Sequence, residues 1–267
     1  MNVQSNVAIS VDGVPIHYDV QGNGPIALVF VHGWCCDRHY WDRQVSHFPH
    51  YTVVTLDLAG HGASGRDRAR WTMPAFGQDV VAVVEQLGLK QVVLIGHSMG
   101  GAVIIEAARR LPAAVIGLVG AETWNDLEHA LVAPAQIPEF LAPFRANWVE
   151  KMSAFIRDMF APTSDPTLVE ETVAAGLTFP PDIAIAVAEE ALAYDDLRQV
   201  GLREIQVPKI AINSTDSWLK TNVEAMQRCG IEVTWMSGVG HCIMLEDPQT
   251  FTRLLDEAVK KITHPRK

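Results

Sequence analysis

The chain has 267 residues, of which 48% are hydrophobic and 19% charged, and its formal net charge at pH 7 is −10. This length fits one large α/β domain, and the scattered Lys and Arg residues offer no basic surface for nucleic acid. The apolar runs are too short to cross a bilayer, the N-terminus does not resemble a signal peptide, and the four cysteines give no disulfide framework. We therefore expect a soluble cytoplasmic protein that acts on neither membranes nor nucleic acids.

Strands and helices are expected to alternate along most of the chain. Alternation around Asp12-Gly13 predicts a hairpin over 7–20, and solid apolar or β-branched runs predict strands buried on both faces. In chain order, the expected elements after the hairpin are strand 26–31, helix 40–48, strand 51–56, helix 76–87, strand 92–95, helix 102–110, strand 115–121, strand 209–212, helix 223–229, strand 232–236 and helix 249–262. This order predicts a mostly parallel sheet covered by helices on both faces.

The stretch from about Asn125 to Leu202 interrupts this alternation. It carries prolines between short helical segments and shows no convincing strand. Large apolar side chains recur at its start and along it: Trp124, Phe140, Phe144, Trp148, Met152, Phe155, Met159 and Phe160. Such stripes usually face a helical core, but here we expect some of them to face a binding pocket. The prediction is a helical lid over 125–202, inserted into a core formed by 1–124 and 203–267.

A serine stands at the apex of a predicted strand-turn-helix. Residues 96–100 read Gly-His-Ser-Met-Gly, which fits the G-x-S-x-G pattern, with an apolar strand before it and a helix after it. A serine hydroxyl is a weak nucleophile unless it is exposed, aimed and paired with a base, and a sharp strand-to-helix turn provides the exposure. We therefore identify Ser98 as the candidate nucleophile.

His241 is the best candidate for the base that such a serine needs. It follows the predicted strand 232–236 in a glycine-flexed loop. His32 and His61 come before the serine, and His97 is its direct neighbour, so we expect its side chain to point away from the serine. The chain order Ser…acid…His requires a late histidine, and His264 lies in a charged tail.

Two other motifs predict different chemistry but lack the context for it. Residues 60–65 fit G-x-G-x-x-G, but the segment that follows does not open a helix as a dinucleotide site requires. His32, Cys35, Cys36 and His39 are ligand types for zinc, yet no second pair completes four-coordination. We therefore expect neither a metal nor a cofactor.

Taken together, these motifs resemble the α/β-hydrolase superfamily, specifically its capped, lipase-like esterases. The resemblance rests on His32-Gly33-Trp34, on residues 57–64, on residues 96–101 and on Gly240-His241, and it covers nearly the whole core. It implies a mostly parallel eight-stranded sheet with helices on both faces and an inserted helical lid. It also implies an oxyanion hole formed by the backbone N–H groups of Trp34 and Met99.

The resemblance leaves two candidates for the triad acid. The family commonly places it after the seventh strand, where Asp216 stands one residue early and the usual glycine is missing. Some relatives, including haloalkane dehalogenases, place it at the end of the sixth strand, where this chain has Glu122. The missing glycine favours Glu122 over Asp216, and either strand end borders the base.

The resemblance and the serine together imply an esterase without a cofactor. Serine at the elbow argues against dehalogenation and epoxide opening, which use Asp there, and implies an acyl-enzyme on Ser98 with His241 as general base and acid. We expect small, largely hydrophobic esters or lactones, bound by His32, Gly33, Trp124, Phe144 and Trp148. Arg38, Arg145 and Arg157 could bind a substrate carboxylate. The alternatives are a C–C bond hydrolase, a perhydrolase or a slow ligand receptor of the same fold, as a monomer or homodimer.

Overall fold

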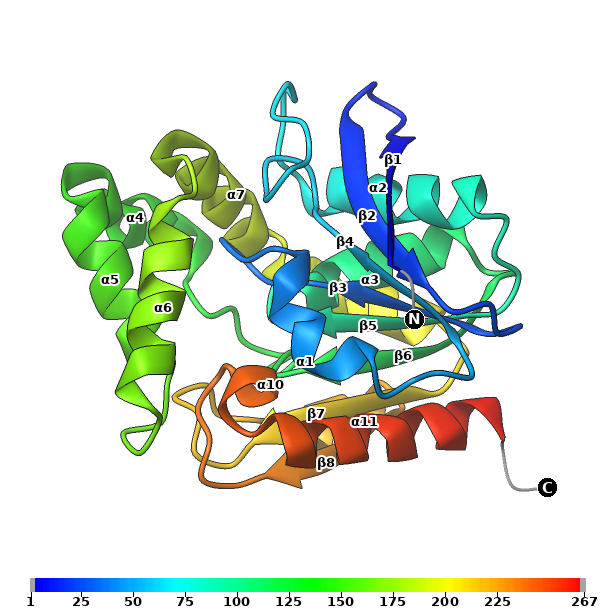
Figure 1. Ribbon diagram of the computed structural model, residues 1–267. Helices are drawn as coiled ribbons and strands as arrows, with labels where there is room; N and C mark the ends of the chain where they lie inside the picture. Colours follow the sequence, from blue (N-terminus) through cyan, green and yellow to red (C-terminus); the bar gives the residue numbers. More distant parts are fainter. Residues whose placement is uncertain (1–2, 265–267) are drawn as a thin grey trace.

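A central sheet of eight strands runs through the protein in the order β1-β2-β4-β3-β5-β6-β7-β8 (Figure 1). The computed structural model describes residues 3–264, except for the side chains of 195–197. β1 and β2 run antiparallel to their neighbours, and the remaining pairs are parallel, as predicted. The strands are β1 (Gln4–Ile9), β2 (Pro15–Gln21), β3 (Ala27–Val31), β4 (Thr52–Leu56), β5 (Val92–His97), β6 (Val115–Ala121), β7 (Lys209–Ser214) and β8 (Ile231–Met236).

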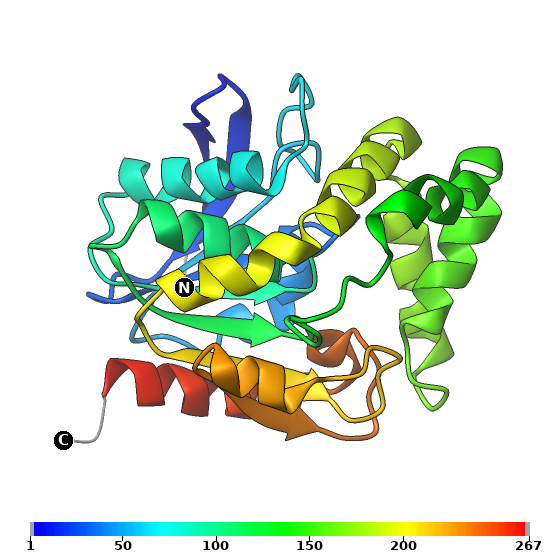
Figure 2. The same ribbon diagram turned by 180° about the vertical axis from the view of Figure 1, so that it is seen from behind.

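Helices cover both faces of this sheet, because its central strands are apolar on both sides. Every residue of β3, β4 and β5 is buried, which is typical of parallel strands between two helical layers. One face carries η1 (Arg38–Trp41), α1 (Asp42–Val45), α10 (Ile243–Glu246) and α11 (Pro248–Thr263). The other carries α2 (Met73–Gln86), α3 (Gly100–Arg110), α8 (Asp195–Glu204) and α9 (Val223–Arg228) (Figure 2).

A group of helices stands outside this layered core, next to the carboxyl ends of the parallel strands (Figures 1 and 2). It consists of η2 (Pro134–Gln136), α4 (Ile137–Ala146), α5 (Trp148–Asp158), α6 (Pro166–Leu177) and α7 (Pro181–Ala193). We call residues 134–193 the helical segment. Among the described residues, no helix combines the length and apolar character that crossing a membrane would need.

The helical segment ends earlier than the predicted lid. α8 begins inside the predicted 125–202 lid, ends at Glu204 and packs on core helix α3. A Cβ added at Gly201 would come within 2.4 Å of Ile105 Cγ2, and the Tyr194 hydroxyl donates to Glu106 Oε1 at 2.6 Å. The predicted boundary at residue 202 therefore falls within a helix that packs on the helical layer of the core.

The carboxyl ends of β5, β6, β7 and β8 all point to the same edge of the sheet, because these strands are parallel. Ser98 directly follows β5, and Glu122 directly follows β6. His241 lies in the loop between β8 and α10. In open α/β sheets this edge is where ligands bind. The topology therefore brings three residues that are distant in sequence to one place.

Candidate active site

Ser98 occupies a strained turn between β5 and α3. Its φ angle is +53°, a left-handed conformation that costs free energy for a residue with a Cβ. Its backbone N–H donates to the carbonyl of Ala121 at 3.1 Å, and its own carbonyl accepts from the Thr123 hydroxyl at 2.8 Å. Gly100 lets the turn approach β3, because a Cβ there would lie 2.6 Å from the Val31 carbonyl oxygen. The turn thus holds Ser98 at the tip, partly exposed in an otherwise buried environment.

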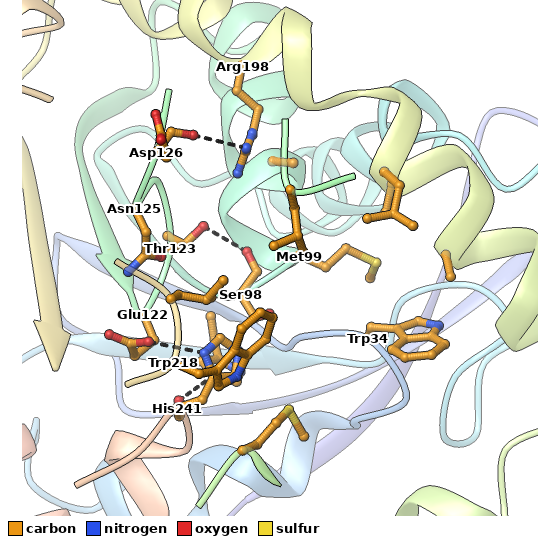
Figure 3. A pocket seen from close by; sticks show the side chains of 18 of the residues that line it. Trp34, Ser98, Met99, Glu122, Thr123, Asn125, Asp126, Arg198, Trp218 and His241 are labelled. Atoms are coloured by element: carbon orange, nitrogen blue, oxygen red, sulfur yellow. Dashed lines mark hydrogen bonds and ion pairs between the residues drawn. The ribbon is translucent and has the colours of Figure 1, made fainter. Parts of the chain in front are cut away.

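His241 is paired with a buried glutamate. Its Nδ1 lies 3.1 Å from Oε2 of Glu122, and the Glu122 side chain is fully buried. The other carboxylate oxygen of Glu122 accepts from the backbone N–H of Ser214 at 2.6 Å. Glu122 also has a positive φ of +47°. Figure 3 shows Ser98, His241 and Glu122 gathered at one end of the pocket.

Asp216, the alternative acid, does not reach His241. It is exposed, and its Oδ2 accepts from the backbone N–H of Gly238 at 2.7 Å and from the Thr215 hydroxyl at 2.9 Å. These hydrogen bonds lower the pKa of Asp216 below its usual value. The structure therefore places Asp216 as a residue that closes its own loop.

His97 connects the loop of His241 to the turn of Ser98. Its Nε2 lies 3.1 Å from the His241 carbonyl oxygen, and the two imidazole rings are 4.9 Å apart. Burial, followed by the proximity of His241, holds the pKa of His97 well below its usual value. His97 is therefore neutral at physiological pH, and its Nε2–H donates to the carbonyl of His241.

Trp34 and Met99, the residues of the predicted oxyanion hole, lie beside the same space. Met99 precedes the first residue of α3, where helix N–H groups have no partner within the helix. Within residues 3–264, no protein acceptor is recorded for either N–H group. Both residues line the cavity that contains Ser98. They are therefore available as donors to a group bound next to the serine.

This cavity has a volume of about 450 Å³ and lies between the strand ends and the helical segment. Its inner end is formed by Ser98, Met99, Glu122 and His241. Its walls are mainly apolar, formed by Trp34, Leu131, Phe140, Phe155, Met159 and Trp218. The rings of Trp34 and Phe155 meet edge to face at 5.6 Å, and those of Phe155 and Trp218 at 6.5 Å. Asp126, Arg198 and Lys220 add polar groups to the lining.

Five residues predicted to bind substrate do not line this cavity. His32 is fully buried, and its ring is held by the Leu58 N–H on one side and the Gly33 carbonyl on the other. Gly33 lies against the Ser98 turn, where a Cβ would come 3.0 Å from His97 Nδ1. These two residues shape the loop that carries Trp34. The structure therefore corrects their predicted role from substrate contact to support.

The three aromatic residues of that prediction lie behind the cavity wall. Trp124 is fully buried, and its indole N–H donates to the Gly101 carbonyl at 3.1 Å. Phe144 and Trp148 pack edge to face against Trp34, with ring centroids at 6.1 and 6.4 Å. Phe140, Phe155 and Met159, from the same apolar stripes, face the cavity instead. Trp218 follows β7 in a loop without periodicity, so no sequence pattern could place it.

The arginines considered for a substrate carboxylate lie elsewhere. Arg38 binds Asp19 and Asp57, Arg145 binds Glu189, and Arg157 binds Glu170. The arginine in the cavity lining is Arg198, which donates to the carbonyl of Asp126 at 3.2 Å (Figure 3).

The described part of the chain has no group of three or more His, Cys, Asp or Glu side chains arranged to hold a metal ion. Of the four zinc-type residues near position 35, His39 is exposed and pairs with Asp42 at 3.1 Å. Cys36 lines the cavity, and burial raises its pKa to about 12. A thiol with such a pKa is protonated at neutral pH and is a weak ligand and nucleophile.

Comparison with known proteins gives a consistent result. The sequence model of the alpha/beta hydrolase family matches residues 28–254. The chain is 31% identical to the lipase LipV of Mycobacterium tuberculosis over 167 residues, which cover 60% of this chain and 63% of the lipase. It is 24% identical to the strigolactone esterase RMS3 of Pisum sativum, over 91% of this chain and 96% of that protein.

A solved structure shares the whole fold. The thermophilic esterase of Thermogutta terrifontis superposes with a TM-score of 0.82 at 22% identity, covering 97% of this chain and 99% of that one. The matches to the first curated relatives are shorter. They span 63% of the lipase and 29% of an acetyltransferase component from Cupriavidus necator.

Proposed function

The chain belongs to the alpha/beta hydrolase family, and we propose that it is a serine hydrolase that cleaves carboxylic esters or lactones of small, largely hydrophobic substrates. The observation that carries this proposal is the arrangement at the strand ends. A serine in a strained, partly exposed turn shares one cavity with a histidine whose Nδ1 faces a buried glutamate. The ester-cleaving relatives named above support the reaction class.

In the proposed mechanism, His241 takes the proton of Ser98 while the serine oxygen attacks the substrate carbonyl. The protonated His241 then gives this proton to the leaving alcohol, and an acyl-enzyme forms. Water attacks the acyl group in the second half of the cycle, with His241 as base again. Glu122 accepts from Nδ1–H, which keeps Nε2 free to take the serine proton and stabilises the imidazolium.

The oxyanion is proposed to bind to the N–H groups of Trp34 and Met99. The N–H groups at the first turn of a helix carry a partial positive charge, which favours a developing anion. Removing one oxyanion donor typically costs about 3–4 kcal/mol in transition-state stabilisation. Because both donors are backbone groups, no side-chain substitution removes them directly.

The substrate class follows from the walls of the cavity. About 450 Å³ enclosed mainly by aromatic and aliphatic side chains favours an apolar acyl or aryl group over a charged one. Burial of each methylene group contributes about 0.8 kcal/mol to binding. We therefore expect kcat/KM to rise with acyl length until the chain fills the cavity.

The test is hydrolysis of p-nitrophenyl esters from acetyl to octanoyl, with Ser98→Ala as the variant and exposed Ser46→Ala as the matched control. Loss of the nucleophile should lower kcat by about 10³-fold or more, whereas Ser46→Ala should match the wild type. Labelling by a fluorophosphonate, followed by peptide mapping, should place the adduct on Ser98. If the wild type is no faster than Ser98→Ala on every ester, the proposed function is wrong.

A further inference from the structure

Glu246 binds both sides of the catalytic histidine's backbone. It lies at the end of α10, and its Oε1 accepts from the N–H groups of Gly240 at 3.0 Å and of Cys242 at 3.1 Å. These are the residues directly before and after His241. Hydrogen bonds from N–H groups to an ionised carboxylate are among the stronger ones in proteins. The carboxylate therefore fixes the path of the loop that carries His241.

The second oxygen of Glu246 binds the helical segment. Its Oε2 shares the Gly240 N–H with Oε1, at 2.9 Å. It also accepts from the Ala161 N–H at 2.9 Å and from the Ser164 hydroxyl at 2.6 Å. Both donors lie in the turn between α5 and α6, which we call the 159–164 turn. One carboxylate thus joins two segments that are about 80 residues apart in sequence.

The two segments also touch directly at their backbones. The N–H of His241 donates to the Met159 carbonyl at 2.6 Å. A Cβ added at Gly240 would lie 2.3 Å from the same oxygen and 2.7 Å from the Ala161 nitrogen, so only glycine fits at this position. Met159 also lines the cavity. The backbone of the 159–164 turn therefore lies directly against that of the catalytic loop.

We propose that Glu246 is a positioning residue that locks the 159–164 turn to the His241 loop, so that this turn belongs to the catalytic framework and not to a movable lid. The proposal rests on the proposed function of His241. Three polar groups of His241 are then held: its N–H by Met159, its carbonyl by His97 and its Nδ1 by Glu122. Productive catalysis requires such groups to be held within about 0.5 Å.

This arrangement also decides where substrate enters. Lifting the 159–164 turn would break the bonds that hold His241. Elsewhere the lining of the cavity carries large apolar side chains that are partly exposed to solvent: Leu131 at 49%, Phe140 at 40% and Trp218 at 44%. Substrate therefore enters between these three residues while the 159–164 turn stays closed.

Glu246→Gln is the direct test, because the amide keeps the shape but turns one acceptor into a donor. The donors of either the His241 loop or the 159–164 turn then face the new side-chain NH₂ group, which cannot accept a hydrogen bond. We expect kcat to fall by about 10–100-fold, the scale of a small misplacement of a catalytic group, with KM within about threefold of wild type.

The controls separate positioning from folding. Glu171→Gln removes an exposed carboxylate from α6 and should leave kcat unchanged. Ser164→Ala removes one donor on the segment side and leaves the carboxylate in place, so a smaller fall in kcat is expected. If Glu246→Gln lowers only the melting temperature and leaves kcat unchanged, Glu246 is merely structural and the proposal is overturned.

Hydrogen exchange tests the lock without using the activity. In Glu246→Gln, amides of 240–242 and of 161–164 should exchange faster together, while those of β5 stay protected. Unchanged exchange, or faster exchange in only one of the two segments, would overturn the proposal. Fluorophosphonate labelling distinguishes the two hypotheses: no adduct on wild-type Ser98 refutes the proposed function, whereas equal labelling rates in wild type and Glu246→Gln refute positioning.

Discussion

The strand ends and the helical segment are held by different kinds of contact. Ser98, Glu122 and His241 are held by backbone hydrogen bonds, two of them in left-handed conformations. The helical segment meets solvent with exposed ion pairs such as Arg157 with Glu170, and meets the cavity with Phe140 and Phe155. Backbone strain is therefore found at the residues of the proposed chemistry. The large apolar side chains are found where a substrate would be selected. Glu246 is the point at which the two regions join.

The largest effect expected from this comparison is at Glu122, the proposed acid of the triad. Glu122→Gln should lower kcat by about 10³–10⁴-fold, because the amide no longer holds His241 in the correct tautomer and does not stabilise its charge. Asp216→Asn should stay within about threefold of wild type, since that carboxylate only closes its own loop. Steady-state kinetics on one p-nitrophenyl ester decide between them. A larger loss of kcat in Asp216→Asn than in Glu122→Gln would make Asp216 the acid. The proposed acid would then lie after β7 and not at the end of β6.

Residues of the strand-end region could be found from sequence because local rules specify them. An apolar strand, a glycine-flanked serine and a following helix can form one type of turn, and Ser98 has the predicted setting. The alternation of elements likewise predicts the parallel sheet, which the structure confirms. The missing glycine near Asp216 pointed to Glu122, the residue whose carboxylate lies at His241.

The roles of residues in the helical segment could not be assigned from sequence, because side chains of one apolar stripe pack against two different surroundings. Phe140 and Phe144 are one helical turn apart on α4, yet Phe140 lines the cavity and Phe144 packs on Trp34. Periodicity identifies a buried face but not the neighbour that buries it. Glu246 gave no signal either, because its partners in the 159–164 turn come from a distant part of the chain.

A second expected difference between the core and the helical segment is the effect of acid on stability, which should come from histidines in the core. Burial lowers the pKa of His32, His61 and His97, so below about pH 6.5 the unfolded chain takes up protons that the native core does not. The free energy of unfolding should therefore fall as pH decreases from 6.5 to 5, by at most about 4 kcal/mol per pH unit for three histidines. Urea unfolding from pH 8 to pH 5 measures this slope.

Carboxylates with a lowered pKa, such as Asp12 and Asp19, lose their contribution only at still lower pH. They therefore do not explain a fall in stability between pH 6.5 and 5. His129→Gln, at an exposed position, is the control and should keep the slope of the wild type. A free energy of unfolding that stays constant from pH 7 to pH 5 would contradict the buried neutral state of these histidines.

The smallest effect expected is at the entrance, where substrate selection should be separable from chemistry. Trp218→Ala removes an apolar wall that is 44% exposed and packs on Phe155. We expect kcat/KM for octanoyl esters to fall about tenfold, since partial burial of an indole contributes about 1–2 kcal/mol, while acetyl esters change by less than about threefold. Trp235→Ala, at a tryptophan 42% exposed on β8 outside this cavity, is the matched control. An equal loss on both ester lengths would mean that Trp218 supports the catalytic loop, and would move the boundary between the two regions outward to the mouth of the cavity.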